Sequence, residues 1–156
     1  MKIFKLIVSL AVCGLAAFAG SLFTTSKIPT WYAGLNKPFF TPPNWLFAPA
    51  WTTLYVLMGI SLYLVWQKGT EVPGVKKGMT IFLVQLVFNS AWSIVFFGLE
   101  SPLGGVAVIV VLWVAILLTM IQFFKLSKAA GWLLVPYLAW VSFASALNVA
   151  VFILNR

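Results

Sequence analysis

The residues best able to do chemistry in this sequence are aromatic and amide side chains at helical spacing. Two such pairs stand three or four residues apart, Trp51 with Tyr55 and Asn89 with Trp92, and Trp140 stands four residues before the small Ala144, which would leave room for a ligand. Residues at that spacing share one face of a helix, so each pair can point into a common interior. Flat rings pack against a planar ligand, each contact adding about 0.5–1.5 kcal/mol beyond burial. The pattern predicts a pocket for a large, flat, lipophilic molecule.

Acid–base and metal chemistry have few candidate residues here. The sequence contains no His and two acids, Glu71 and Glu100, both in predicted loops. It lacks a nucleophile–His–acid set, a carboxylate pair and a metal-ligand cluster, so we predict no metal site and no covalently bound cofactor. Only Met58 and Tyr55 could reach a haem iron from an inward face, which favours a metal-free ligand. The single Cys13 is expected to be a packing residue.

The composition places these residues in a membrane. Of the 156 residues, 63% are hydrophobic and 8% are charged, which leaves too little polar surface for a soluble globule. The charged residues delimit five uncharged runs, each reaching the roughly 20 residues of a membrane-spanning helix. We predict an all-α membrane protein, a bundle of five transmembrane helices in a single domain (1–156), with spans at about 5–26, 44–66, 79–99, 103–124 and 131–154.

The first apolar run has two interpretations. Residues 1–20 have the basic start and small residues of a signal peptide, but the apolar stretch continues through Leu22 and Phe23 to spanning length, which favours a membrane helix. Ala16 and Gly20 are small residues four apart that allow close approach of another helix. Packing within the bundle and dimerisation would both explain them.

The net charge of +8 indicates orientation. The cations occur in ones and twos beside apolar runs and form no stripe, so no nucleic-acid partner is expected. With five spans, seven cations fall on one side and three on the other, namely Lys2, Lys5, Lys68, Lys76, Lys77, Lys125 and Lys128 against Lys27, Lys37 and Arg156. The positive-inside rule then places the N-terminus in the cytoplasm and the C-terminus outside.

The connection between the first two predicted spans is rich in proline and aromatic residues. Pro38, Pro42 and Pro43 prevent a continuous helix there. Trp31 and Tyr32 would be costly to leave in water. We therefore expect this connection to fold back as a lid over one cavity, which residues of the second, third and fifth spans line.

Three groups of residues follow one another in a characteristic order. They are Trp31, Tyr32, Leu35, Lys37, Pro38, Thr41, Pro42, Pro43, Phe47, Trp51, Leu54 and Tyr55; then Asn89, Trp92, Phe96, Phe97 and Gly98; and then Pro136, Tyr137, Trp140, Phe143, Ala144, Leu147 and Asn148. In residue type and spacing they resemble the tryptophan-rich sensory protein and translocator protein family (TspO/MBR), also called peripheral-type benzodiazepine receptors.

The resemblance implies a five-helix bundle, often a homodimer, in a prokaryotic plasma membrane. Members bind porphyrins such as protoporphyrin IX, and some bind cholesterol or synthetic drugs. Bacterial members are linked to light- and oxygen-dependent breakdown of the bound porphyrin, and Trp51 and Trp140 match the tryptophans implicated in that reaction. The expected ligand-binding residues are Tyr32, Pro42, Trp51, Tyr55, Asn89, Trp92, Trp140, Phe143, Ala144, Leu147 and Asn148.

Three functions are compatible with this pattern. The first is a receptor or sensor for porphyrins that also degrades them in light. The second is a passive transporter of lipophilic ligands such as a tetrapyrrole or a sterol, although the family's sterol pattern has Tyr where this chain has Val149. The third is an assembly subunit whose pocket is packed core. Asn89 and Asn148 could equally bond a ligand or join helices.

Overall fold

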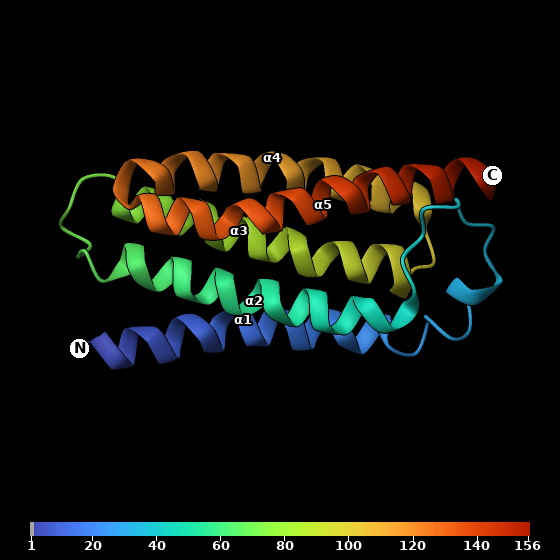
Figure 1. Cartoon of the computed structure of the whole chain (residues 1–156), viewed down its shortest axis with the longest axis horizontal. Helices are drawn as coiled ribbons and strands as arrows, with labels where there is room; N and C mark the ends of the chain where they lie inside the picture. Colours follow the sequence, from blue (N-terminus) through green and yellow to red (C-terminus); the bar gives the residue numbers. More distant parts are fainter. Residues whose placement is uncertain (1) are drawn as a thin grey trace.

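The computed structural model describes residues 2–156 as an up-and-down bundle of long helices (Figure 1). The helices are α1 (Lys2–Thr24), α2 (Asn44–Trp66), α3 (Val75–Ser93), α4 (Pro102–Leu126) and α5 (Lys128–Leu154). Two short elements complete the fold, the 3₁₀-helix η1 (Tyr32–Gly34) and the π-helix η2 (Ile94–Gly98), which continues α3. Five helices are long and apolar enough to cross a membrane, which confirms the predicted fold class.

The helices begin and end close to the predicted spans, with one systematic difference. α2 covers the predicted residues 44–66, whereas α3 begins at Val75 instead of 79 and α5 begins at Lys128 instead of 131. The spans were delimited by apolar runs, but these two helices begin earlier, at or beside lysines that precede the runs, because the long lysine side chains reach the polar headgroups. Ser101 and Ser127 cap α4 and α5 by accepting hydrogen bonds from the backbone of Gly104 and Ala130.

The bundle has a tightly packed body and one peripheral helix. α4 packs along α3 and α5, and α2 packs against α5, whereas α1 contacts mainly α2 and α3. The buried residues of α1 are Ser9, Cys13 and Gly20, and large apolar residues such as Phe18 are exposed along it. An apolar exposed face suits contact with lipid.

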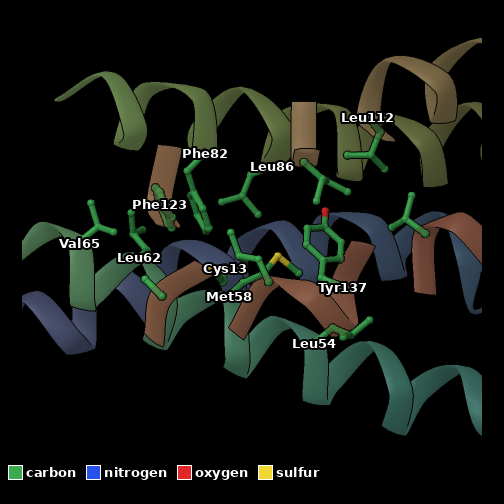
Figure 2. Close-up of a cluster of buried hydrophobic side chains, with 14 of the residues drawn as sticks. Cys13, Leu54, Met58, Leu62, Val65, Phe82, Leu86, Leu112, Phe123 and Tyr137 are labelled. Atoms are coloured by element: carbon green, nitrogen blue, oxygen red, sulfur yellow. The ribbon is translucent and has the colours of Figure 1, made fainter. Parts of the chain in front are cut away.

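The main core lies in the half of the bundle that carries the N-terminus. Met58, Phe82 and Tyr137 are completely buried, and Phe82 stacks on Phe123 with ring centres 5.8 Å apart. Figure 2 shows these side chains around Cys13, which is a buried packing residue, as expected. Close packing of this kind leaves little free space, so cavities must be sought at the other end of the bundle.

Candidate ligand-binding site

The connection between α1 and α2, residues 25–43, covers the end of the bundle that carries the C-terminus (Figure 1). We call this segment the lid. Tyr32 of η1 inserts into the bundle and is 1% exposed, with its ring 6.1 Å from that of Phe47 and 5.8 Å from that of Phe97. Phe40 packs against Phe143 of α5 at 6.0 Å. The predicted folding of this segment onto the bundle is therefore observed.

Side-chain hydrogen bonds and one ion pair fasten the lid to the rest of the chain. The backbone N–H of Asn36 donates to Asn155 Oδ1 at 2.9 Å, and Asn155 Nδ2 donates to the Asn36 carbonyl at 2.8 Å. We call this reciprocal pair the Asn36–Asn155 clasp. Lys27 also pairs with Glu100 at 3.3 Å, but a partly exposed ion pair contributes little.

Lys37 forms hydrogen bonds within the lid. Its Nζ donates to the carbonyls of Tyr32 at 2.9 Å and Leu35 at 3.1 Å, and lies 4.9 Å from the centre of the Tyr32 ring. The ammonium charge is thereby held beside the one lid side chain that enters the bundle. Its backbone partners also explain how a proline-rich segment without regular structure keeps a defined shape.

Beneath the lid, the rings of Trp51 and Trp140 meet. Trp51 of α2 lies 6.4 Å from Trp140 of α5 in an edge-to-face arrangement, 5.8 Å from Tyr55 and 6.4 Å from Tyr137. Trp140 in turn lies 5.7 Å from Phe143. Edge-to-face and tilted rings are the favoured geometries of aromatic pairs. The two tryptophans singled out from the sequence are thus neighbours inside the bundle.

A second aromatic group comes from the end of α3. Trp92 stacks on Phe96 at 5.2 Å, and Trp31 of the lid lies 5.5 Å from Phe96. The wider π-helical turn of η2 allows the adjacent residues Phe96 and Phe97 to be buried together, at 3% and 4% exposure. Single π-helical turns are frequent at functional sites.

Two cavities adjoin these rings. The larger, of about 150 Å³, lies between α1, α2 and α3. The smaller, of about 20 Å³, lies between α2, α3, α5 and the lid. Four side chains line both cavities and separate them, and we call these residues the aromatic partition: Phe47, Trp51, Trp92 and Phe97.

The predicted site residues divide between the two cavities. Tyr55 and Asn89 line the larger one, Trp51 and Trp92 line both, and Pro42 lines neither. The smaller cavity is lined by Tyr32, Trp140, Phe143, Ala144, Leu147 and Asn148. The residues that were expected to line one cavity are therefore divided between two, because the side chains of the aromatic partition separate them.

α1 also lines the larger cavity, which the sequence did not predict. Ala17, Gly20 and Ser21 form the α1 wall of the larger cavity. Gly20 faces Ser93, and the Ser90 hydroxyl donates to the Ala16 carbonyl at 3.1 Å, so small residues bring α1 close to α3 within one chain. The spacing of small residues was the available signal, and it indicated a close helix contact without identifying the partner.

The amides are used to join helices. Tyr55 donates to Asn89 Oδ1, Asn89 Nδ2 donates to the Tyr137 hydroxyl at 2.7 Å, and Tyr137 donates to Gln85 Oε1 at 2.6 Å. We call these four residues the buried polar network; Gln85 and Tyr137 were not among the predicted site residues. The network connects α2, α3 and α5. Of the two roles considered for Asn89, binding a ligand or joining helices, this structure shows the second.

Asn148 is also bonded within the protein. Its Oδ1 accepts from Trp92 Nε1 at 2.9 Å, and its Nδ2 donates to the Pro102 carbonyl at 2.8 Å. Asn148 thereby fixes Trp92, one wall of the aromatic partition, and ties α5 to the start of α4. The other predicted amide thus also joins helices in this structure.

Four buried side-chain polar atoms lack a hydrogen-bond partner within residues 2–156. They are Ser9 Oγ, Tyr32 Oη, Gln85 Nε2 and Trp140 Nε1. An unpaired buried group costs about 1–3 kcal/mol.

Burial also raises the pKa of Tyr32 to about 12, so its hydroxyl keeps its proton at neutral pH. No three His, Cys, Asp or Glu side chains gather anywhere in that range.

Comparison with known proteins agrees with the motif assignment. Residues 9–154 match the TspO/MBR family. The chain is 50% identical over 155 residues to the tryptophan-rich protein TspO of Archaeoglobus fulgidus, covering 99% of both chains. It is 40% identical to the tryptophan-rich sensory protein of Cereibacter sphaeroides (94% of this chain, 88% of the relative) and 38% identical to the human translocator protein (88% and 82%). The chain therefore belongs to the TspO/MBR family.

Proposed function

We propose that this protein is a membrane receptor or sensor that binds porphyrins, such as protoporphyrin IX, beneath its lid. The observation that carries the proposal is the edge-to-face pair of Trp51 and Trp140, which lies under a lid and beside two cavities. Aromatic walls with few polar groups suit a flat apolar ring system. A relative named as a sensory protein supports the receptor function.

A tetrapyrrole requires more space than the closed structure offers. Pockets that hold drug-sized ligands measure roughly 300–1,000 Å³, whereas the two cavities measure about 150 and 20 Å³. Trp92 is fixed by Asn148, but Phe47 and Trp51 stand in the first turns of α2, next to the lid. Binding therefore involves displacement of these two side chains, which joins the cavities, together with movement of the lid.

Trp51 and Trp140 give the proposed site its photochemistry. An indole beside an excited porphyrin can supply an electron to it, and dioxygen supplies the oxidant for breakdown of the ring. The protein would contribute the position and the bound porphyrin the reactivity. The buried polar network holds Tyr137, against which Trp51 packs, and so fixes the position of the donor.

Titration of protoporphyrin IX into the purified protein tests binding. We expect saturable quenching of tryptophan fluorescence, and bleaching of the bound porphyrin under light and oxygen. Trp51→Phe and Trp140→Phe should slow bleaching, whereas Trp132→Phe, an exposed tryptophan that packs on Phe124 at the other end of the bundle, should not. Absence of saturable quenching would reject the receptor. Unchanged bleaching in both site variants would reject the photochemical role.

A passive transporter of tetrapyrroles or sterols is the second candidate. The larger cavity has Ser21, Thr25 and Ala48, all exposed, on its rim, so it opens sideways between α1 and α2. The name of the human relative, translocator protein, fits such a path. Flux of porphyrin or sterol into vesicles, compared with protein-free vesicles, separates the two functions. If neither binding nor flux occurs, the assembly subunit with a filled pocket is favoured.

We also propose a placement for the protein. It would lie in a prokaryotic plasma membrane, as a homodimer of the kind known in the family, with the lid on the outer side. The observation behind the orientation is the charge distribution: by the bounds of the helices, seven lysines lie at the end of the bundle that carries the N-terminus. Chemical cross-linking in membranes, compared with a monomeric membrane protein, tests the dimer.

A further inference from the structure

We propose that the Tyr32 hydroxyl and the Trp140 indole N–H are hydrogen-bond donors that select a ligand carrying a carboxylate at the lid end of the site. This inference rests on the proposed function, because it concerns the porphyrin site itself. It adds a requirement that flatness and hydrophobicity do not impose. A ring system with acceptor oxygens would be preferred over the same ring system with alkyl groups alone.

The first observation is that the Tyr32 hydroxyl and the Trp140 indole N–H are buried donor atoms without a partner in the described part of the chain. Elsewhere in the bundle such donors are paired: Trp92 with Asn148, Trp113 with Ser142, and Tyr137 with Gln85. Tyr32 Oη and Trp140 Nε1 are buried without any partner within residues 2–156. Unpaired buried donors are rare in folded proteins, and each one calls for an explanation.

The second observation is where the two donors lie. Of the two cavities, only the smaller is lined by Tyr32 and Trp140, and the other two unpaired atoms belong to residues that line neither. Of the other polar lining groups, Trp92 and Asn148 are bonded to each other, and Asn148 also donates to the Pro102 carbonyl. The Trp140 N–H can only donate and the Tyr32 hydroxyl can donate as well as accept, so a ligand that presents an acceptor can bond both.

The third observation concerns charge and size. Lys37 Nζ lies 4.9 Å from the centre of the Tyr32 ring, and the lid contains no acid, so the local charge favours an anion. A cavity of about 20 Å³ exceeds the roughly 10–15 Å³ that one water molecule needs. It can therefore take an oxygen of a carboxylate while the ring system occupies the space that displacement of Phe47 and Trp51 opens. Hydrogen bonds to charged groups are stronger than those between neutral groups.

The experiment compares three porphyrins that share one ring: protoporphyrin IX with carboxylates, its dimethyl ester with neutral acceptors, and etioporphyrin with alkyl groups alone. Each is titrated into the full-length protein and into Tyr32→Phe, with Tyr63→Phe as the control, because Tyr63 lies near the far end of α2. We expect the wild type to bind protoporphyrin IX about tenfold or more tightly than etioporphyrin, with the ester between them.

Tyr32→Phe should lose about tenfold in affinity for protoporphyrin IX and keep its affinity for etioporphyrin, which also demonstrates that the variant is folded. Trp140→Phe should show the same selective loss. Equal binding of all three porphyrins by the wild type, or equal loss of all three in Tyr32→Phe, would overturn the inference while leaving porphyrin binding intact. Failure of the wild type to bind any porphyrin would instead reject the proposed function and this inference with it.

Discussion

Tyr137 connects two amides of α3 from the opposite side of the bundle. Its hydroxyl accepts from Asn89 and donates to Gln85, so a single phenol satisfies both. Amides at bilayer depth are unfavourable unless they are partnered, and Tyr137, at 0% exposure, is shielded from bulk solvent. The position of Tyr137 is thereby fixed, and the ring of Trp51, which also contacts Trp140, packs against it.

Tyr137→Phe should therefore destabilise the protein more than other Tyr→Phe substitutions. The change leaves the side chains of Asn89 and Gln85 without their shared partner, which should cost about 1–3 kcal/mol. The free energy of unfolding in detergent, measured by denaturant titration, is the readout. Tyr63→Phe on α2 is the control, since Tyr63 lies outside the buried polar network. Equal losses in the two variants would contradict this role for Tyr137.

Tyr32 provides a test of lid closure through its titration. Burial raises its pKa from about 10 to about 12. Because the closed lid holds the proton more tightly than the open lid, closure keeps its full stability below about pH 10 and loses it as the pH rises towards 12. The difference in tyrosinate absorbance between the wild type and Tyr32→Phe should show a midpoint near 12. A midpoint near 10 would mean that Tyr32 is exposed and the lid open.

At the scale of elements, apolar runs predicted which segments are helices but not which helices touch. The contact between α1 and α2 depends on Gly59, where a Cβ atom would lie 3.1 Å from Leu10 Cα. The contact between α1 and α3 depends on Gly20, which faces Ser93. These contacts depend on three-dimensional fit, which a run of similar apolar residues does not encode. The motifs led us to expect Trp51 and Trp140 in one site, and their rings do meet, but the α1 wall of the larger cavity could not be predicted from apolar runs.

A pair of glycine substitutions separates packing from helix propensity. Gly59→Ala should destabilise the bundle by about 1–3 kcal/mol, because the added carbon meets the backbone of α1, which must move away. Gly14→Ala on α1 has no atom within 4 Å of its new carbon and should stabilise the helix by about 0.5–1 kcal/mol. Denaturant titration in detergent measures both. A neutral or stabilising Gly59→Ala would show that α1 does not pack closely on α2.

The Asn36–Asn155 clasp controls how often the lid opens. Asn155→Ala removes both of its hydrogen bonds, which together contribute about 1 kcal/mol net, so the open population should rise about fivefold. Tryptic cleavage after Lys27 in the lid should accelerate by the same factor, since cleavage follows the open population. Asn44→Ala, an exposed asparagine at the start of α2, should leave the rate unchanged. Unaltered cleavage in Asn155→Ala would show that other contacts hold the lid.

At the scale of the whole molecule, composition and motif order were sufficient to predict the five-helix bundle and the family. Charge spacing also divided the cations correctly between the two ends, because alternate loops of an up-and-down bundle lie at the same end (Figure 1). The volume of the site could not be predicted, since it depends on how far Phe47 and Trp51 fill the space beneath the lid. A ligand-sized cavity and a packed aromatic cluster have the same residue pattern.

The direction of insertion follows from the same distribution of charge. Seven cations at the end that carries the N-terminus and three at the other should keep the N-terminus in the cytoplasm. In a bacterial host, alkaline phosphatase fused to the C-terminus should be active, and green fluorescent protein fused at the same position should be dark.

Replacing Lys68, Lys76 and Lys77 by Gln should give a mixed population of orientations, because the two ends then differ by one cation. Glu71→Gln in the same loop is the control, since acids contribute little to orientation. A fluorescent C-terminal fusion of the wild type would reverse the proposed orientation and place the lid in the cytoplasm.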